Sequence, residues 1–563
     1  MKLIDSSSAD CVNCYKCLRN CPVKAISYAN NKATVEPDSC ILCGECVSIC
    51  PQHAQIVRDD LDSFRLFLSN NKVVASVAPS FIGDFNCNSF SEIRDKLIKV
   101  GFYDAFETIV GARIADNKYE KILKTSDELL ISTACPTVVN YVTKYYPKLV
   151  KYLAPVVSPM VAHALLLKKL DPTIKVAFIG PCLSKKDEIT WEEGTVDFAL
   201  TFQEIDKLFS ENNITFPEDD SIKGLNFSKQ KIRMYPTTGG IIDSFNDRQK
   251  NYNYISCDGL KDVGKFLDEI SLNPYKNTFL ELSACSGSCI NGPCRVNKDN
   301  FLQTKLRLSK YIKSEREKEL PSVVDEIDFS RKFVPSPPKD MIPSSFEIRQ
   351  ILGKIGKKSE EDDLNCGACG FSSCREKAIA VYNGKASLEM CLPYMKEKAE
   401  SLSSEIIENS PNAIICFNSN LELQNINEQA YKLLGIREDL SKEEIDIESY
   451  LDIYDFQILV TSKNNNIVNK KLITRKTERT IQLNIVFVSS LDFVFGVFND
   501  VTEAEYKEKL LHDVRKNTIK VTDSVIDKQM RSVQEIASLL GETVAETKIA
   551  LTKLKKVMED DNV

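Results

Sequence analysis

The sequence predicts a multidomain protein that combines α+β and α/β domains. Its 563 residues exceed what one hydrophobic core supports, because single cores stop growing beyond about 250–300 residues. Residues 59–330 begin with alternating strand-like apolar runs and helical stretches, the pattern of an α/β domain. Residues 401–503 contain two hairpin-like strand pairs instead, which indicates a separate α+β domain. A cysteine-rich segment, residues 1–58, precedes both domains.

The composition is that of an ordinary soluble globular protein, with 43% apolar residues, 27% charged residues and a net charge of −7. This balance gives no support for a nucleic-acid partner or a polybasic membrane surface. No run of eighteen apolar residues occurs, and residues 1–6 lack the apolar region of a signal peptide. We therefore expect a cytoplasmic protein without a nucleic-acid or membrane partner. Twenty cysteines beside three histidines then favour metal ligation by thiolates over disulfides.

The first 58 residues contain a repeated cysteine run, spaced C-x2-C-x2-C-x3-C-P in both copies. This is the spacing of bacterial ferredoxins, in which the fourth cysteine of each run binds the other cluster. It predicts a 2[4Fe–4S] ferredoxin-like domain that transfers electrons. One cluster takes Cys11, Cys14, Cys17 and Cys50, and the other takes Cys40, Cys43, Cys46 and Cys21. A pair of zinc knuckles is the alternative, although zinc sites rarely use crossed spacing of this kind.

Three apolar runs of the α/β domain lead into cysteines at their carboxyl ends. The runs and their cysteines are 128–134 with Cys135, 175–181 with Cys182, and 278–282 with Cys285 and Cys289. In an α/β sheet the ligand site lies outside the carboxyl ends of the strands, so these loops should converge. Four thiolates at one point suit an iron–sulfur centre.

The loops around these cysteines resemble the three signature loops of the [FeFe] hydrogenases. The matching segments read TACP, PCLSKKDE and ELSACSGSCINGP, with VGARIA and TTGGII fitting as well, over about residues 70–295. The resemblance implies an H-cluster, which is a [4Fe–4S] cubane joined to a diiron subcluster with CO, cyanide and dithiolate ligands. The implied cubane ligands are Cys135, Cys182, Cys285 and Cys289. Cys289 would also bridge to the diiron unit, and Lys185 and Ser80 would donate hydrogen bonds to its cyanides. A relative that keeps only the cubane is the alternative.

The sequence departs from the catalytic members of this family around the diiron unit. Ala134 stands where a cysteine passes protons, and Ala154 stands where a serine continues the relay. Gly180 and Ser283 replace methionines that pack against the diiron unit. Because proton transfer by a placed side chain typically contributes about 10²–10⁴-fold to a rate, we expect H2 to bind but to turn over slowly.

A third set of cysteines follows a proline-containing linker at residues 331–345. Their spacing within residues 346–400 is C-x2-C-x4-C-x16-C, and they are Cys366, Cys369, Cys374 and Cys391. The segment resembles the small four-cysteine [4Fe–4S] module of iron–sulfur signalling and corrinoid-linked proteins. Zinc is the alternative, because four thiolates would suit it equally. The chain would then hold three accessory [4Fe–4S] clusters beside the H-cluster.

The last 160 or so residues contain no further cluster motif. Residues 401–503 resemble a PAS domain. This segment contains no histidine, and Cys416 does not lie in a flavin-adduct motif, so no cofactor is indicated there. Residues 504–563 form a helical tail with a short heptad seam. That tail either packs on its own domain as a helical hairpin or forms a dimer or partner-docking segment.

A slow H-cluster beside a PAS-like domain resembles the sensory [FeFe] hydrogenases. We therefore expect a protein that binds H2 and protons and exchanges electrons with a redox partner such as ferredoxin. An unknown signalling partner would read the PAS-like domain and the tail, and a homodimer is a further option. The alternatives are a metabolic ferredoxin-linked hydrogenase with a docking PAS domain and a non-hydrogenase iron–sulfur scaffold.

Overall fold

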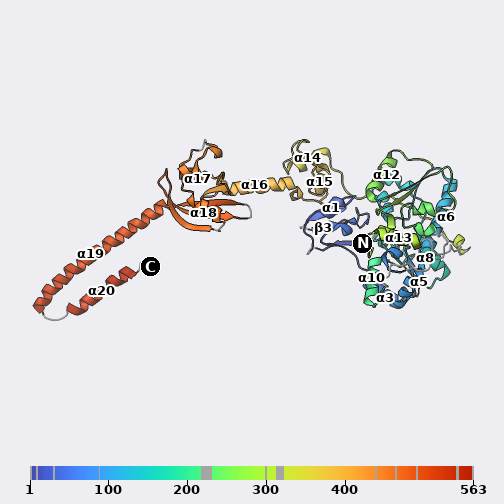
Figure 1. Cartoon of the computed structure of the whole chain (residues 1–563), viewed down its shortest axis with the longest axis horizontal. Helices are drawn as coiled ribbons and strands as arrows, with labels where there is room; N and C mark the ends of the chain where they lie inside the picture. The colour runs from blue at the N-terminus through green and yellow to red at the C-terminus, as the bar shows by residue number, and fades with distance from the viewer. Residues whose placement is uncertain are drawn as a thin grey trace. The chain divides into compact units, whose positions relative to one another are not determined.

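The computed structural model describes residues 3–7, 10–29, 32–87, 89–216, 231–297, 301–311, 322–437, 440–462, 466–489, 492–540 and 544–560. Contacts divide the chain into two units, Met1–Met395 and Lys396–Val563, whose elements Figure 1 labels. Within the described ranges, no helix has both the length and the apolar character needed to cross a membrane.

The N-terminal cysteine-rich segment folds as two antiparallel strand pairs with two short helices. The strands are β1 (Ile4–Ser6) with β4 (Gln55–Val57), and β2 (Ile26–Ala29) with β3 (Lys32–Val35). Each helix contains the third cysteine of one run, Cys17 in α1 (Lys16–Asn20) and Cys46 in α2 (Glu45–Ile49). The two cysteine runs therefore adopt the same local fold.

The central part of the first unit contains two parallel sheets, ordered β6–β5–β8–β9 and β10–β11–β7. Their strands are β5 (Val73–Val77), β6 (Asp104–Glu107), β7 (Leu129–Ile131), β8 (Lys175–Gly180), β9 (Phe198–Thr201), β10 (Asn253–Asp258) and β11 (Thr278–Ser283). Every residue of β5 and β11 is buried, as expected for strands covered on both faces. The predicted α/β architecture is confirmed.

Helices cover these sheets. The longer ones are α3 (Leu61–Asn70), α5 (Phe90–Lys99), α6 (Ile109–Thr125), α7 (Pro136–Tyr145), α8 (Pro159–Leu170), α10 (Phe202–Glu211), α12 (Leu260–Leu272) and α13 (Phe301–Tyr311). Three short ones border the central loops, namely α4 (Phe81–Asp84), α9 (Lys185–Glu188) and α11 (Gly240–Ser244). α6 packs against α8. His163 of α8 is buried, and its Nδ1 shares a hydrogen bond of 2.7 Å with Ser76 Oγ of β5.

The four-cysteine segment folds around two packed helices, α14 (Ser345–Gly353) and α15 (Cys374–Tyr382). A capping box between Ser344 and Glu347 begins α14. α16 (Leu392–Glu408) starts directly after Cys391 and leads into the second unit.

The second unit contains one antiparallel sheet of five strands, ordered β13–β12–β16–β15–β14. The strands are β12 (Ala413–Asn418), β13 (Leu423–Ile426), β14 (Asn466–Ile473), β15 (Thr480–Val488) and β16 (Phe493–Asp500). Between β13 and β14 lie α17 (Glu428–Leu434) and α18 (Tyr454–Ser462). β15 alternates buried and half-buried residues, so one face of the sheet packs on these helices. The predicted PAS-like α+β domain is confirmed.

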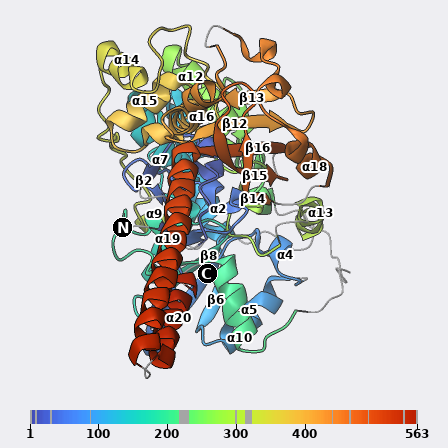
Figure 2. The ribbon, with the colours of Figure 1, turned by 90° about the vertical axis from the view of Figure 1, so that its left-hand side faces the viewer.

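The tail forms a helical hairpin. α19 (Thr502–Leu540) and α20 (Val544–Asp560) run side by side in both views (Figures 1 and 2). An ion pair of 3.1 Å between Lys555 and Asp523 fixes their antiparallel register.

Candidate functional site

A cavity opens at the carboxyl ends of the central strands. Three of the predicted cluster cysteines line it, and they are Cys135, Cys182 and Cys289. The fourth, Cys285, lies beside them. Burial first, and then the neighbouring thiols of Cys182, Cys135 and Cys289, raise the pKa of its thiol well above the usual range. The structure thus brings together the four cysteines that three separate loops supply.

This donor set fits an iron–sulfur centre. Burial, ahead of the neighbouring thiols, raises the pKa of Cys182 to about 11 and that of Cys289 to about 12. Buried thiolates form only where a positive centre compensates their charge, which iron would do here. The hydroxyl of Ser80 is buried in the cavity wall and has no hydrogen-bond partner among the described residues. An acceptor on a bound group, such as a cyanide, would satisfy it.

Lys185 is held at the edge of the same cavity. Its Nζ donates hydrogen bonds to Glu188 Oε2 at 2.5 Å, to Ser158 Oγ at 3.1 Å and to the carbonyl of Ala134 at 3.4 Å. Lys185 begins α9, three residues after Cys182, so the cluster loop itself places the ammonium group at the cavity. The arrangement leaves a cationic donor next to the thiols.

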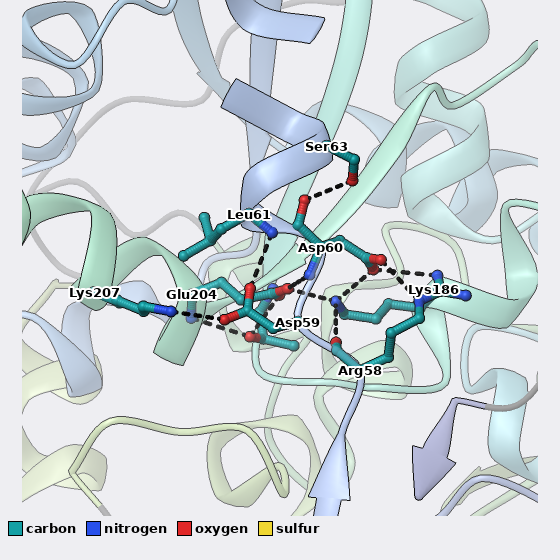
Figure 3. A network of polar contacts seen from close by, with 9 residues as sticks. Arg58, Asp59, Asp60, Leu61, Ser63, Lys186, Glu204 and Lys207 are labelled. Carbon is teal, nitrogen blue, oxygen red and sulfur yellow. Dashed lines mark hydrogen bonds and ion pairs between the residues drawn. The ribbon is translucent and has the colours of Figure 1, made fainter. Parts of the chain in front are cut away.

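The next residue, Lys186, belongs to a separate polar network (Figure 3). Its Nζ lies 2.7 Å from carboxylate oxygens of Asp60 and Glu204 and donates to the carbonyl of Arg58 at 3.0 Å. The Lys186 side chain is 1% exposed, so the two carboxylates must compensate its buried charge. The network joins three elements: the segment before α3, the first turn of α10, and α9. It thereby fixes the loop that carries Cys182.

Small side chains stand at the positions where the sequence departs from the catalytic family. Ala134 and Ser283 line the cavity, and Ala154 is fully buried. At Gly180, an added Cβ would lie 2.7 Å from Cε1 of Phe178, so the phenyl ring occupies that volume. The wall next to Cys135 therefore carries a methyl group in place of a proton-carrying side chain.

Three further hollows in the first unit are each ringed by one predicted cysteine set. They are lined by Cys11, Cys14, Cys17 and Cys50; by Cys21, Cys40, Cys43 and Cys46; and by Cys366, Cys369, Cys374 and Cys391. The first two sets are those that crossed ferredoxin spacing predicts. Lys377 supplies a cation at the third hollow, where its Nζ donates to the carbonyl of Leu388 at 2.9 Å.

Neighbouring sites along the first unit are close enough to interact. Thr137, two residues after Cys135, donates from its hydroxyl to the carbonyl of Leu42, next to Cys43, at 3.5 Å. α1, which contains Cys17, packs against α2, which contains Cys46. Leu18 of α1 belongs to the same hydrophobic cluster as Phe371, two residues after Cys369. These contacts give the order central cavity, ferredoxin-type sites and four-cysteine site.

Glycines permit close approach at two junctions of this series. At Gly44, with φ +77°, a Cβ would lie 2.5 Å from Pro293 Cβ and 2.8 Å from Leu183 Cδ2. At Gly370, with φ +92°, a Cβ would lie 3.0 Å from Leu18 Cδ2. A Cβ at Gly44 would force its loop away from Pro293, a Cβ at Gly370 would press on the Leu18 side chain, and both backbone conformations favour glycine.

Sequence reasoning missed two polar residues at the cavity. Tyr235 lines the cavity, and Asp116 interacts with it electrostatically, as does Glu281, which the sequence offers as a more distant acid. Asp116 directly follows VGARIA, and only Pro236 separates Tyr235 from TTGGII. Polar residues inside or beside otherwise apolar signature segments were the available signal.

Fold and site together define an iron–sulfur protein with a buried, cysteine-bound centre in an α/β domain. Residues 71–293 match the family described as "Iron only hydrogenase large subunit, C-terminal domain". Residues 71–293 therefore form an iron-only hydrogenase-like domain. Residues 3–51 match a 4Fe-4S dicluster domain, and residues 362–393 match an Fe-S cluster family, which favours iron–sulfur over zinc at the third cysteine set.

Individual relatives are distant. The chain is 24% identical over 243 residues to the NADP-reducing hydrogenase subunit HndD of Solidesulfovibrio fructosivorans, covering 36% of this chain and 42% of that one. It is 35% identical over 102 residues to the cytosolic Fe-S cluster assembly factor NAR1 of Kluyveromyces lactis, covering 17% and 22%. The structure of [FeFe]-hydrogenase HydA1 from Chlamydomonas reinhardtii aligns at 14% identity and a TM-score of 0.38, over 50% of this chain and 100% of that one. The chain thus spans less than half the length of these two curated relatives.

Proposed function

We propose that the protein binds H2 at an H-cluster in the central cavity, oxidises it slowly and acts as an H2 or redox sensor. The observation that carries this proposal is Ala134, whose methyl group lines the cavity next to Cys135 while Lys185 and the thiols are retained. A site that keeps its ligands but loses a placed proton carrier should bind H2 and turn it over slowly.

When bound, the H-cluster would supply an open iron as Lewis acid and an amine base for cleaving H2. The chain's own residues would hold and surround it. Cys135, Cys182, Cys285 and Cys289 would anchor the cubane, and Cys289 would also hold the diiron unit. Lys185 and Ser80 would donate hydrogen bonds to the cyanides, and the side chains of Met160 and Phe178, which line the cavity, would exclude water.

Electrons would leave through three accessory [4Fe–4S] clusters in series, ending at the four-cysteine site. α16 begins directly after Cys391, and its carbonyl at Ile407 accepts a hydrogen bond of 2.9 Å from Asn427 Nδ2. The Asn427 side chain also caps α17 of the PAS-like domain by accepting from the N–H of Ala430. One helix thus connects the four-cysteine site to a capping residue of the PAS-like domain. Through this helix, a change in the redox state of the third cluster would act on the second unit.

Hydrogen exchange of the matured protein under H2 and under argon tests the signalling part of this proposal. We expect altered protection in residues 396–563 under H2, because a changed third cluster should bias the equilibrium of α16 and the PAS-like domain. A Cys391→Ser variant should lose that difference. Identical protection in both gases would leave the second unit as a docking module for a metabolic hydrogenase, which high specific activity would also indicate.

A second candidate is a non-hydrogenase iron–sulfur scaffold. The match to a protein named as a cytosolic Fe-S cluster assembly factor favours it. Such a scaffold would hold cubanes without a diiron unit, so infrared spectra after maturation would lack CO and cyanide bands. The buried, unpartnered hydroxyl of Ser80 supports the H-cluster, since a scaffold has no use for a donor in that wall.

A further inference from the structure

The side chains of Ala134 and Ala154 carry no exchangeable proton; Ala134 lines the cavity and Ala154 is fully buried. Lys185, whose Nζ reaches the Ala134 carbonyl, is held by Glu188 and Ser158. Thr133, between β7 and Ala134, uses both of its donors internally. Its N–H donates to Tyr119 Oη at 3.0 Å, and its hydroxyl donates to the carbonyl of Val156 at 2.8 Å. Protons must leave the cavity elsewhere if H2 is oxidised.

Tyr235 stands on a different wall. It follows the short helix η2 (Lys231–Met234), lines the cavity and is 9% exposed. Its hydroxyl is buried and has no hydrogen-bond partner among the described residues, which is uncommon for a buried polar group. Burial, followed by the charge of Asp116, raises the pKa of Tyr235 well above its usual value, so the hydroxyl stays protonated.

Asp116 of α6 lies behind Tyr235 and is fully buried. Its Oδ2 accepts a hydrogen bond from Ser244 Oγ at 2.7 Å and lies 3.7 Å from Arg113 Nη1. Its Oδ1 has no hydrogen-bond partner within the described ranges. Burial, with smaller contributions from nearby acids, raises the pKa of Asp116 well above its usual value. The raised pKa makes this carboxylate a better proton acceptor than an ordinary one.

Glu120 lies one helical turn beyond Asp116, a separation of about 5–6 Å between Cβ atoms that one water or a rotamer change can bridge. Its Oε1 accepts hydrogen bonds from the backbone N–H groups of Asn246 and Asp247 at 2.6 and 3.3 Å. Both of these residues are exposed, and Glu120 itself is 8% exposed. The series Tyr235, Asp116, Glu120 therefore begins in the cavity and ends at a buried carboxylate that binds the backbone of two exposed residues.

One further acid faces this series from β11. Glu281 Oε2 accepts a hydrogen bond from the N–H of Ile242 at 3.0 Å, and burial raises the pKa of Glu281 to about 7. The backbone N–H groups of Gly239, Ile241 and Ile242, at the start of α11, donate to this carboxylate. Glu281 thereby fixes the loop between Tyr235 and α11.

We propose that Tyr235, Asp116 and Glu120 form a proton pathway, here called the α6 pathway, that replaces the one interrupted at Ala134 and Ala154. The proposal rests on the proposed H2 chemistry. Oxidation of one H2 releases two protons and two electrons, and the electrons leave through the iron–sulfur clusters. Each proton that arrives at the Tyr235 oxygen displaces that group's own proton to Asp116 Oδ1, from which a proton passes to Glu120 and then to water. All three groups return to their starting state.

The test compares Tyr235→Phe and Asp116→Asn in the full-length matured protein. Both variants should oxidise H2 about 10- to 100-fold more slowly with an artificial electron acceptor, since each lacks one proton-carrying group. Asp116→Glu keeps a carboxyl group and should recover most of the rate. Tyr252→Phe is the matched control, because Tyr252 is a buried tyrosine that does not line the cavity and whose hydroxyl donates only to the carbonyls of Ser126 and Glu128, and its turnover should stay within about twofold of the unmodified protein.

A second readout does not depend on turnover. The infrared difference spectrum between H2 and argon should contain a carboxylic acid C=O band that Asp116→Asn abolishes and Tyr252→Phe leaves in place. CO and cyanide bands in every variant establish that the diiron unit is assembled, and their absence from the unmodified protein would refute the proposed H2 chemistry itself. If fully assembled Tyr235→Phe and Asp116→Asn oxidised H2 as fast as the unmodified protein, the α6 pathway alone would be overturned.

Discussion

Lys24 Nζ donates a hydrogen bond of 3.0 Å to the backbone carbonyl of Gly370, which joins the ferredoxin-like domain to the loop that carries Cys369. Lys24 also donates to the carbonyls of Leu18 and Arg19, so one ammonium group bridges α1 and the four-cysteine segment. The N–H of Tyr28 adds a 2.7 Å bond to the carbonyl of Lys385 at the same junction. This junction holds the four-cysteine segment against the ferredoxin-like domain.

Gly370→Leu should disconnect the third cluster from the others. The Cβ of the new side chain would lie 3.0 Å from Leu18 Cδ2, whereas a Cβ at Gly384, another glycine with positive φ, would have no atom within 4 Å. Both variants should lose about 1–2 kcal/mol of stability from the left-handed backbone. Only Gly370→Leu should slow reduction of the third cluster by H2, as followed by freeze-quench EPR. Equal rates in the two variants would show that electrons reach this cluster by another path.

Ala134→Cys should raise H2 turnover by roughly one to two orders of magnitude, because a thiol can carry protons where the methyl group cannot. Adding Ala154→Ser should raise it further, although Gly180 and Ser283 still leave the surroundings of the diiron unit altered. The same double change should rescue Asp116→Asn, since it opens a second proton pathway. Turnover assays normalised to CO band intensity measure both effects. Failure to rescue a fully assembled protein would place the slow step outside proton transfer.

The cysteine spacing alone predicted each cluster set, because ligands to one cluster lie within short loops or follow a known crossed pattern. The three-loop convergence around Cys135, Cys182 and Cys285 followed from the carboxyl-end rule for α/β sheets. The α6 pathway could not be predicted, since Asp116 and Tyr235 are far apart in sequence and meet only through the packing of η2 on α6. The bond between Lys24 and Gly370, 346 positions apart, was inaccessible for the same reason.

Lys185→Met should prevent stable binding of the diiron unit while the cubane remains. It also leaves Glu188, whose side chain is 1% exposed, without its 2.5 Å partner; because Arg331 remains 3.7 Å away, the loss of stability should stay below the roughly 3–5 kcal/mol of an unpaired buried charge. Lys207→Met is the control, because its pair with Asp59 is half-exposed and contributes little. Urea unfolding and CO band intensity measure the two effects. Full diiron occupancy in Lys185→Met would rule out a role for this lysine in binding that unit.

His163 should make the protein less stable in acid. Burial lowers the pKa of His163 from 6.5 to about 3 in the folded protein, so the unfolded chain binds the extra proton first. The stabilisation is complete above pH 6.5 and is lost progressively as the pH falls towards 3, by about 1.4 kcal/mol at pH 5.5. Unfolding free energies at pH 7.5 and 5.5 should differ less in His163→Gln than in the unmodified protein. His512→Gln, on exposed α19, should keep the full difference.

The central claim is that the cavity holds an H-cluster that responds to H2. Infrared spectroscopy of the anaerobically matured protein, first under argon and then under H2, measures this most directly. We expect CO and cyanide bands under argon that shift under H2, together with slow H2 oxidation. A protein that contains iron at all its cubane sites but shows no CO or cyanide bands would contradict the claim and identify the chain as an iron–sulfur scaffold.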